Sequence, residues 1–111
     1  MRTIDVVVDP GGPDRPAVVT VAGDVDLATA PELRSRLAPM VESAAGHGRG
    51  LVVDLRHVGY LDSSGLRLLA ALARDVGDGL TVVSPAGTAT RRVLEVSHLT
   101  EHVTVAEAPP R

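Results

Sequence analysis

The sequence predicts an α/β fold in which a mixed β-sheet is packed with helices, in the element order ββαβαβαβ. Two apolar runs near the N-terminus are separated by a turn-rich loop, as in an antiparallel hairpin. Segments with helical periodicity then alternate with strand-like runs, as in helical crossovers between parallel strands. The run at 51–55 is nearly all apolar, which is typical of a strand covered on both faces.

The predicted hairpin joins a strand at 6–8 to a strand at 17–22. The segment between them, 9–16, is dense in proline, glycine and aspartate, so we expect a loop there. It is short enough to connect two antiparallel neighbours.

A first helix is expected after this hairpin, capped by Asp26 or Thr29. Pro31 lies near its first turn, and Glu32 follows Thr29 by three residues, as in a capping box. The segment 46–48 is expected to end it. Apolar residues recur at helical spacing in between, namely Ala30, Leu33, Leu37, Met40, Val41 and Ala44.

A second helix is expected from Ser63 to about Val76, after the strand at 51–55. One apolar stripe of this helix suffices to pack on the sheet: Leu66, Leu69, Ala70, Ala73 and Val76. Three further apolar residues lie off that stripe: Leu68, Ala71 and Leu72. The helix is therefore either wedged between the sheet and a neighbouring helix, or presents these residues to a partner.

The remaining elements complete one domain over residues 1–111. A strand at 80–83 leads through Ser84 and Pro85 into a third helix, and 103–105 is expected to form a last strand. The segment 106–111 contains two prolines, and we expect a frayed, disordered tail there.

Composition excludes several classes of function. The net charge is −3 without a long charge run, and Tyr60 is the only aromatic residue, so we expect no nucleic-acid partner. No apolar run approaches the roughly 20 residues of a membrane span, so we expect no membrane partner. Cysteine and lysine are absent, which excludes thiolate and Schiff-base chemistry. Without a recognisable signal peptide, we expect a cytoplasmic protein.

Ser63 is the main candidate functional residue, because a strand delivers it to the start of a helix. A serine there can cap the helix, act as a nucleophile or accept a phosphate. The nucleophile elbow requires Gly-x-Ser-x-Gly, and here Leu61 replaces the first glycine. We expect no metal site, since Asp24 and Asp26 lack further evident oxygen ligands and the histidines lack ligand spacing. No phosphate-binding loop is present either.

A phosphate on Ser63 would act mainly on a partner protein. The helix N-terminus favours an anion, whereas the neighbouring Asp62 adds a like charge. A new charge of about −2 buried at a fitted surface costs several kcal/mol unless it is paired. The residues alone do not decide whether Ser63 caps the helix or is a phosphorylation switch.

Two motifs resemble those of the STAS domain, the sulphate transporter and anti-sigma factor antagonist family. The first spans 23–33, Gly-Asp-Val-Asp-Leu-Ala-Thr-Ala-Pro-Glu-Leu, and the second spans 53–66 and includes Asp62-Ser63-Ser64-Gly65-Leu66. A weaker third match joins 80–85 to 93–99. The resemblance covers roughly 17–105 and implies the same element order as read above.

The resemblance is closest to stand-alone anti-sigma factor antagonists. It implies that the unphosphorylated protein binds an anti-sigma factor, a serine kinase of the GHKL ATPase type, and so frees a sigma factor. It implies that phosphorylation of Ser63 ends this binding and that a PP2C-type phosphatase resets it. Position by position, the partner-binding residues implied are Asp24, Asp26, Asp62, Ser64, Gly65, Leu66 and Arg67.

Some positions depart from the family pattern. Asp24 stands where glutamate is usual, and Arg67 stands where glycine is frequent. The final helix of the family is expected to be short or absent, because two prolines lie in the last six residues. From the resemblance as a whole, we expect the protein to be a kinase substrate, to be no enzyme and to need no cofactor. The sequence does not determine its oligomeric state. The alternatives are a STAS scaffold or signalling subunit that is not phosphorylated, and a small serine hydrolase.

Overall fold

The computed structural model describes residues 3–47 and 49–110 of the chain. Five strands form one sheet in the order β1-β2-β3-β4-β5. β1 and β2 pair antiparallel, and all other neighbours are parallel, so the predicted hairpin and mixed sheet are confirmed. The strands are β1 (Ile4–Asp9), β2 (Ala17–Val25), β3 (Leu51–Leu61), β4 (Leu80–Val83) and β5 (Thr104–Ala106).

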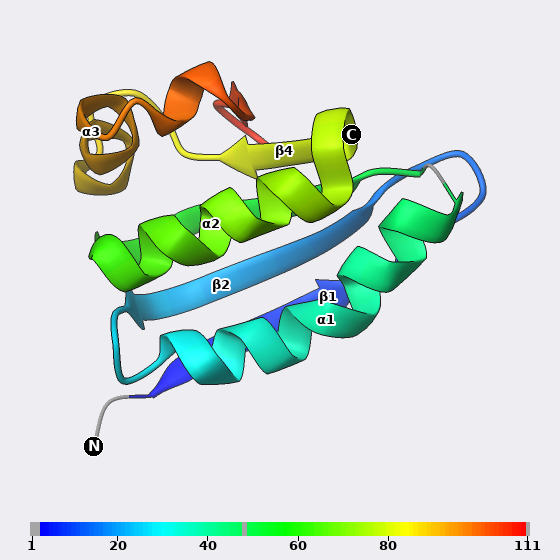
Figure 1. Ribbon diagram of the computed structural model, residues 1–111, viewed down its shortest axis with the longest axis horizontal. Coiled ribbons are helices and arrows are strands. Elements are labelled where there is room, and N and C mark those ends of the chain that lie inside the picture. Colours follow the sequence, from blue (N-terminus) through cyan, green and yellow to red (C-terminus); the bar gives the residue numbers. More distant parts are fainter. Residues whose placement is uncertain (1–2, 48, 111) are drawn as a thin grey trace.

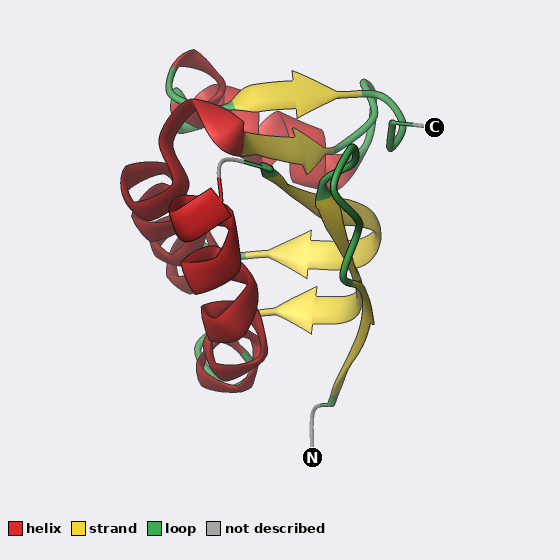
Figure 2. Ribbon diagram, turned by 90° about the vertical axis from the view of Figure 1, so that its right-hand side faces the viewer, coloured by secondary structure: helices red, strands yellow, loops and turns green. Residues whose placement is uncertain are grey.

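Two helices, α1 (Ala30–His47) and α2 (Ser63–Val76), cover one face of the sheet. Figure 2 shows the two layers edge-on, with these helices on one side and the strands on the other. The third helix, α3 (Ala89–Val96), lies beyond the carboxyl end of β4 and contacts β3 (Figure 1). Short 3₁₀ turns follow α2 and α3, at Gly77–Gly79 and Leu99–Glu101. Of the predicted end of α1, Gly48 lies outside the described residues.

The hydrophobic core fills the space between the sheet and α1 and α2. Alternate residues of β1 and of most of β2 enter it, which is the period of two expected for a pleated sheet, whereas β3 is buried without a break from Leu51 to Leu55. The most completely buried apolar side chains are Leu37, Leu51, Leu80, Leu94, Val19, Val21, Val25, Val53, Val82 and Val83.

β3 is longer than the predicted strand at 51–55, because it continues to Leu61. Two irregularities in its pairing with β2 make this possible: β3 advances by one extra residue between Asp54 and His57 and again between Val58 and Tyr60. Each extra residue changes which side chains face the core. Val58 is thereby buried although it breaks the alternation that begins at Leu51, and Leu61 is buried back in step with that alternation.

The last strand begins one residue later than predicted and enters the expected tail. The Val103 N–H donates to the Leu99 carbonyl at 3.2 Å, so it is engaged in a turn when β5 begins at Thr104. Ala106 belongs to β5, and its carbonyl accepts from the Ser84 N–H at 2.9 Å. Glu107 pairs with Arg91 at 3.1 Å. The predicted frayed segment is therefore wrong at 106–107, where backbone and side-chain pairing fix the chain.

Candidate partner-binding site around Ser63

The structure brings the two sequence motifs together at one edge of the sheet. β2 and β3 are parallel neighbours, and Asp24 pairs with Tyr60 where both strands end. The Asp62 N–H donates to the Val25 carbonyl at 3.1 Å, which joins the two loops that follow. Loops at the carboxyl ends of parallel strands are a common place for binding sites. We therefore treat this edge as the candidate functional site.

The N-cap of α2 is Asp62, not Ser63, so the predicted capping role of Ser63 is wrong. Asp62 has extended backbone angles, and its Oδ1 accepts hydrogen bonds from Ser64 N at 2.8 Å and Gly65 N at 3.3 Å. A carboxylate in this place satisfies two helix-start amides and complements the helix dipole. The helix therefore begins independently of the Ser63 hydroxyl.

Ser63 is the first residue of α2 and is exposed. Within the described part of the chain, its hydroxyl makes no hydrogen bond, to a histidine or to any other group. The hydrolase alternative needs a base that activates this hydroxyl. His98, one candidate, instead pairs with Glu101 at 2.7 Å. An exposed hydroxyl held on a helix start is suited to modification by another protein.

Gly65 is buried and shapes the site through packing. A Cβ placed on Gly65 would collide with the Leu61 side chain and lie 3.1 Å from Val25 Cγ1. Glycine thus lets α2 begin directly against the ends of β2 and β3. Of the other predicted contact residues in this motif, Arg67 is exposed, and Ser64 and Leu66 are partly buried.

Asp26 is buried and organises the loop between β2 and α1. Its Oδ1 accepts hydrogen bonds from Ala28 N at 2.9 Å and Thr29 N at 3.1 Å. The Thr29 hydroxyl accepts from Asp26 N at 3.0 Å and donates to the Asp24 carbonyl at 2.7 Å. Thr29 directly precedes α1, and its carbonyl accepts from Leu33 N at 3.1 Å. This network fixes the shape of the loop, and Asp24, which is only partly buried, lies on its rim.

Sequence analysis missed two large exposed side chains at this edge. Leu27 lies in the same loop and is 76% exposed, and Tyr60, at the end of β3, is 53% exposed. Exposed aliphatic and aromatic side chains next to polar groups are typical anchors of protein interfaces. In the sequence, Leu27 is marked only as a leucine flanked by turn residues, and Tyr60 only as the single aromatic residue and as a member of the second motif.

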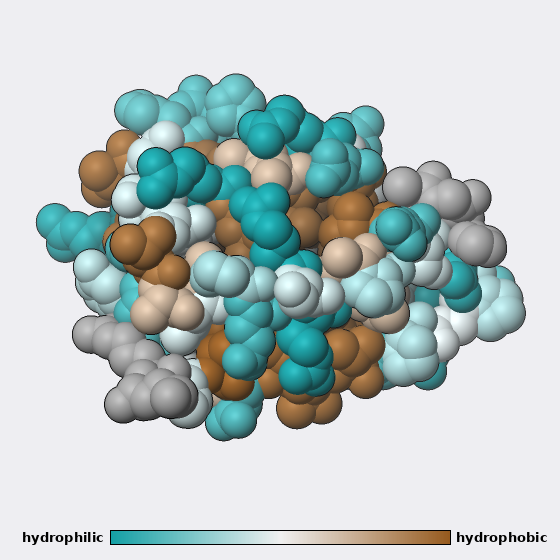
Figure 3. All heavy atoms as spheres, turned by 60° about the horizontal axis from the view of Figure 1, so that its bottom comes forward, coloured by the Kyte–Doolittle hydropathy of each residue, from teal (hydrophilic) through white to brown (hydrophobic). Residues whose placement is uncertain are grey.

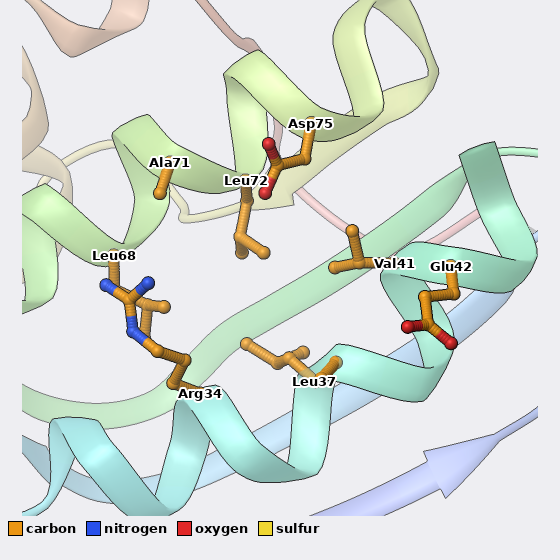
Figure 4. A pocket seen from close by; sticks show the side chains of 9 residues that line it. Arg34, Leu37, Val41, Glu42, Leu68, Ala71, Leu72 and Asp75 are labelled. Carbon is orange, nitrogen blue, oxygen red and sulfur yellow. The ribbon is translucent and has the colours of Figure 1, made fainter.

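The groove between α1 and α2 explains the three apolar residues that lie off the predicted stripe. Leu68, Ala71 and Leu72 face Leu37 and Val41 of α1 across a cavity of about 280 Å³ (Figure 4). Leu68 and Leu72 are almost fully buried, so α2 is wedged between the sheet and α1. Hydrophilic residues interrupt the hydrophobic ones on the face shown in Figure 3. The alternative interpretation, that these residues bind a partner, is not needed to explain them.

Residues 3–47 and 49–110 contain no group of three or more histidine, cysteine or acidic residues that could hold a metal ion. In the same residues, no helix is both long and apolar enough to cross a membrane.

Comparison with known proteins identifies relatives over most of the chain. The family model described as "Mlab, STAS domain" matches residues 8–105. The anti-sigma-F factor antagonist RsfB of Mycobacterium tuberculosis is 34% identical over 84 residues. That match covers 75% of this chain and 66% of the relative, slightly less than two thirds of its length.

Solved structures show the same fold. A crystal structure of an anti-sigma factor antagonist from Mycobacterium paratuberculosis has a TM-score of 0.82 and 30% sequence identity. The similarity covers 96% of this chain and 87% of that one. The unphosphorylated form of the anti-sigma factor antagonist SpoIIAA has a TM-score of 0.65 at 16% identity, over 94% of this chain and 89% of that one.

Proposed function

The chain belongs to the STAS domain family, and from this premise we propose that it is an anti-sigma factor antagonist controlled by phosphorylation of Ser63. The unphosphorylated form binds an anti-sigma factor that is a serine kinase of the GHKL ATPase type, and this binding frees a sigma factor. The kinase then phosphorylates Ser63, the complex dissociates, and a PP2C-type phosphatase resets the protein. The chain is thus a kinase substrate in the cytoplasm, and the ATP belongs to its partner.

The exposed hydroxyl of Ser63 beside an independent helix cap is the observation that carries this proposal. Asp62 holds the first turn of α2, so a phosphate on Ser63 would leave the hydrogen bonds of that turn in place. Relatives whose names state the same function support the anti-sigma factor as the partner.

The switch acts through charge at the contact surface. Exposed Leu27 and Tyr60 would anchor the partner, and Asp24, Ser64 and Arg67 would contact it around Ser63. A phosphate with a charge of about −2 on Ser63 would lose its hydration shell when it is buried in that contact, and this desolvation costs free energy. A penalty of about 3–4 kcal/mol would weaken binding by a few hundredfold.

Co-purification from the native cell tests the proposal. We expect tagged Ser63→Ala to retain an anti-sigma factor kinase and to accept no phosphate. Ser63→Glu should bind this kinase at least about thirtyfold more weakly, a loss of about 2 kcal/mol or more. Ser35→Glu, which adds the same charge at an exposed position of α1, should bind as wild type does.

The other outcomes distinguish the alternatives. Equal affinity of Ser63→Ala and Ser63→Glu would remove the switch and leave a scaffold or signalling subunit. Phosphate found on Ser64 or Thr29 would move the modification site. Ester turnover that is lost in Ser63→Ala would favour a hydrolase.

A further inference from the structure

A second, mainly apolar groove lies between α2 and α3, next to the Ser63 surface. Five residues line it: Leu66 from α2, and Arg92, Val93, Val96 and Ser97 from α3 and its end. Its cavity is about 290 Å³. Leu66 lies three residues after Ser63, which places it one helical turn further along α2. The groove therefore shares Leu66 with the residues that the resemblance implies for partner binding, and it begins one helical turn from Ser63.

The fold does not account for Val96. The buried residues of α3 are Thr90 and Leu94, and the Thr90 hydroxyl donates to the Val58 carbonyl at 3.1 Å. These contacts attach α3 to β3, whereas Val96 is 73% exposed at the edge of the groove. A second hollow of about 660 Å³, formed by α3 and the turn before it, also has Val96 and Arg92 in its lining. Val96 is thus an exposed apolar side chain that lines two surface hollows and does not belong to the hydrophobic core.

Arg92 gives the groove a cation. The neighbouring Arg91 is occupied, because it pairs with Glu95 at 3.5 Å and with Glu107 at 3.1 Å and donates to the Ser84 carbonyl. Of these two adjacent arginines, Arg91 is largely packed and Arg92 is exposed. Among residues 3–47 and 49–110, Arg92 has no ion-pair partner. An occupant that offers a carboxylate beside an aliphatic side chain would therefore complement the groove in charge and polarity.

We infer that the α2–α3 groove is a second contact for the anti-sigma factor, receiving an aliphatic side chain of that protein while one of its carboxylates pairs with Arg92. This inference rests on the proposed function, since it assigns the occupant to the same partner. It adds contacts on α3, a helix that neither of the two main motifs includes, although the weaker third match covers 93–99. It also gives α3 a role in selecting the partner, because the Ser63 surface and the groove must fit one protein together.

Site-specific photocrosslinking tests the inference. A photoreactive amino acid replaces Val96 in the Ser63→Ala protein, and the same amino acid replaces Val7 in a matched control. Val7 is 67% exposed, but it lies on the edge strand β1, which β2 separates from β3, the strand that α3 contacts. We expect the protein modified at 96 to crosslink to the anti-sigma factor recovered with Ser63→Ala, and the protein modified at 7 to give no such product.

Affinities measured with the same purified anti-sigma factor complete the test. Val96→Ser and Arg92→Glu should each weaken binding at least about tenfold. Val7→Ser and Arg74→Glu, the latter at the far end of α2, should bind as wild type does. Circular dichroism melting verifies that each variant is folded.

The outcomes separate this inference from the proposed function. If Ser63→Glu releases the anti-sigma factor while Val96→Ser and Arg92→Glu bind normally and position 96 does not crosslink, the groove is not a contact and the proposed function stands. If Ser63→Ala retains no anti-sigma factor, both are overturned.

Discussion

At the scale of single residues, the site divides two tasks that the sequence assigns to one position. Asp62 caps α2, and Ser63 presents a hydroxyl to solvent. Periodicity locates a helix start only to within a residue or two, so it could not choose between these neighbours. The carboxylate prevails because it accepts from two amides at once, from Ser64 and Gly65.

This division predicts that two neighbouring substitutions differ in their effect on stability. Asp62→Ala removes both cap hydrogen bonds and should lower the free energy of unfolding by about 1 kcal/mol. Ser63→Ala removes a hydroxyl without a partner in the described residues and should change it by less than about 0.5 kcal/mol. Urea denaturation followed by circular dichroism measures both. A larger loss in Ser63→Ala than in Asp62→Ala would contradict the assignment of the cap.

Substitution of Gly65 should create a packing defect next to the proposed phosphorylation site. In Gly65→Ala, the new methyl group meets Leu61 and Val25, which belong to the buried ends of β3 and β2. We expect a loss of about 1–3 kcal/mol in unfolding free energy. Gly12→Ala is the matched control, because its Cβ would meet nothing closer than 3.8 Å. Equal stability of the two variants would show that α2 can shift without cost.

At the scale of elements, β3 is a strand of which the sequence pattern predicts only the first half. The run at 51–55 indicates a buried strand, but the residues after it do not alternate and were not predicted as strand. Two bulges restore burial at Val58 and Leu61, and a bulge depends on the neighbouring strand, which a single-strand pattern does not contain. The first of them follows Asp54, whose carboxylate accepts four hydrogen bonds from Arg56, three from its guanidinium and one from its backbone.

The Asp54–Arg56 pair predicts a pH dependence of stability. Burial acts to raise the pKa of Asp54, but hydrogen bonds and charge from Arg56 outweigh it, so the pKa lies below its usual value. A lowered pKa in the folded state stabilises the protein above the unfolded-state pKa of about 4. This contribution is lost as the pH falls through the folded-state pKa.

Urea denaturation between pH 7 and pH 2 measures this effect. Asp54→Asn should be less stable than wild type by about 1–3 kcal/mol at pH 7 and should lose less stability on acidification. Asp75→Asn is a control, because that carboxyl is exposed on α2. Parallel pH profiles of wild type and Asp54→Asn would refute a lowered pKa at this position.

At the scale of the whole molecule, the sequence predicted the sheet and the crossovers, because these follow from element order. The sequence also holds Asp24 and Ser63 in two separate motifs, which meet because β2 and β3 are adjacent. It did not predict the outer boundary of the site. The positions of the helices decide that Leu27 and Val96 remain exposed in the folded protein. The pairing of Arg91 with Glu107 depends on where the last strand ends. Burial of a single side chain is a property of the assembled fold.

The whole fold also predicts that the proposed phosphorylation switch works without unfolding. Ser63 is exposed, the helix N-terminus favours an added negative charge, and the like charge of Asp62 opposes it, so the two effects largely cancel. The unfolding free energy of protein carrying phosphoserine at 63 should therefore lie within about 1 kcal/mol of that of unmodified protein, with the same hydrogen-exchange protection in the core strands. Its affinity for the anti-sigma factor should nevertheless fall by a few hundredfold. A loss of several kcal/mol in unfolding free energy would mean instead that phosphorylation releases the partner by opening α2, and the contact surface would then not be the part of the molecule that the phosphate acts on.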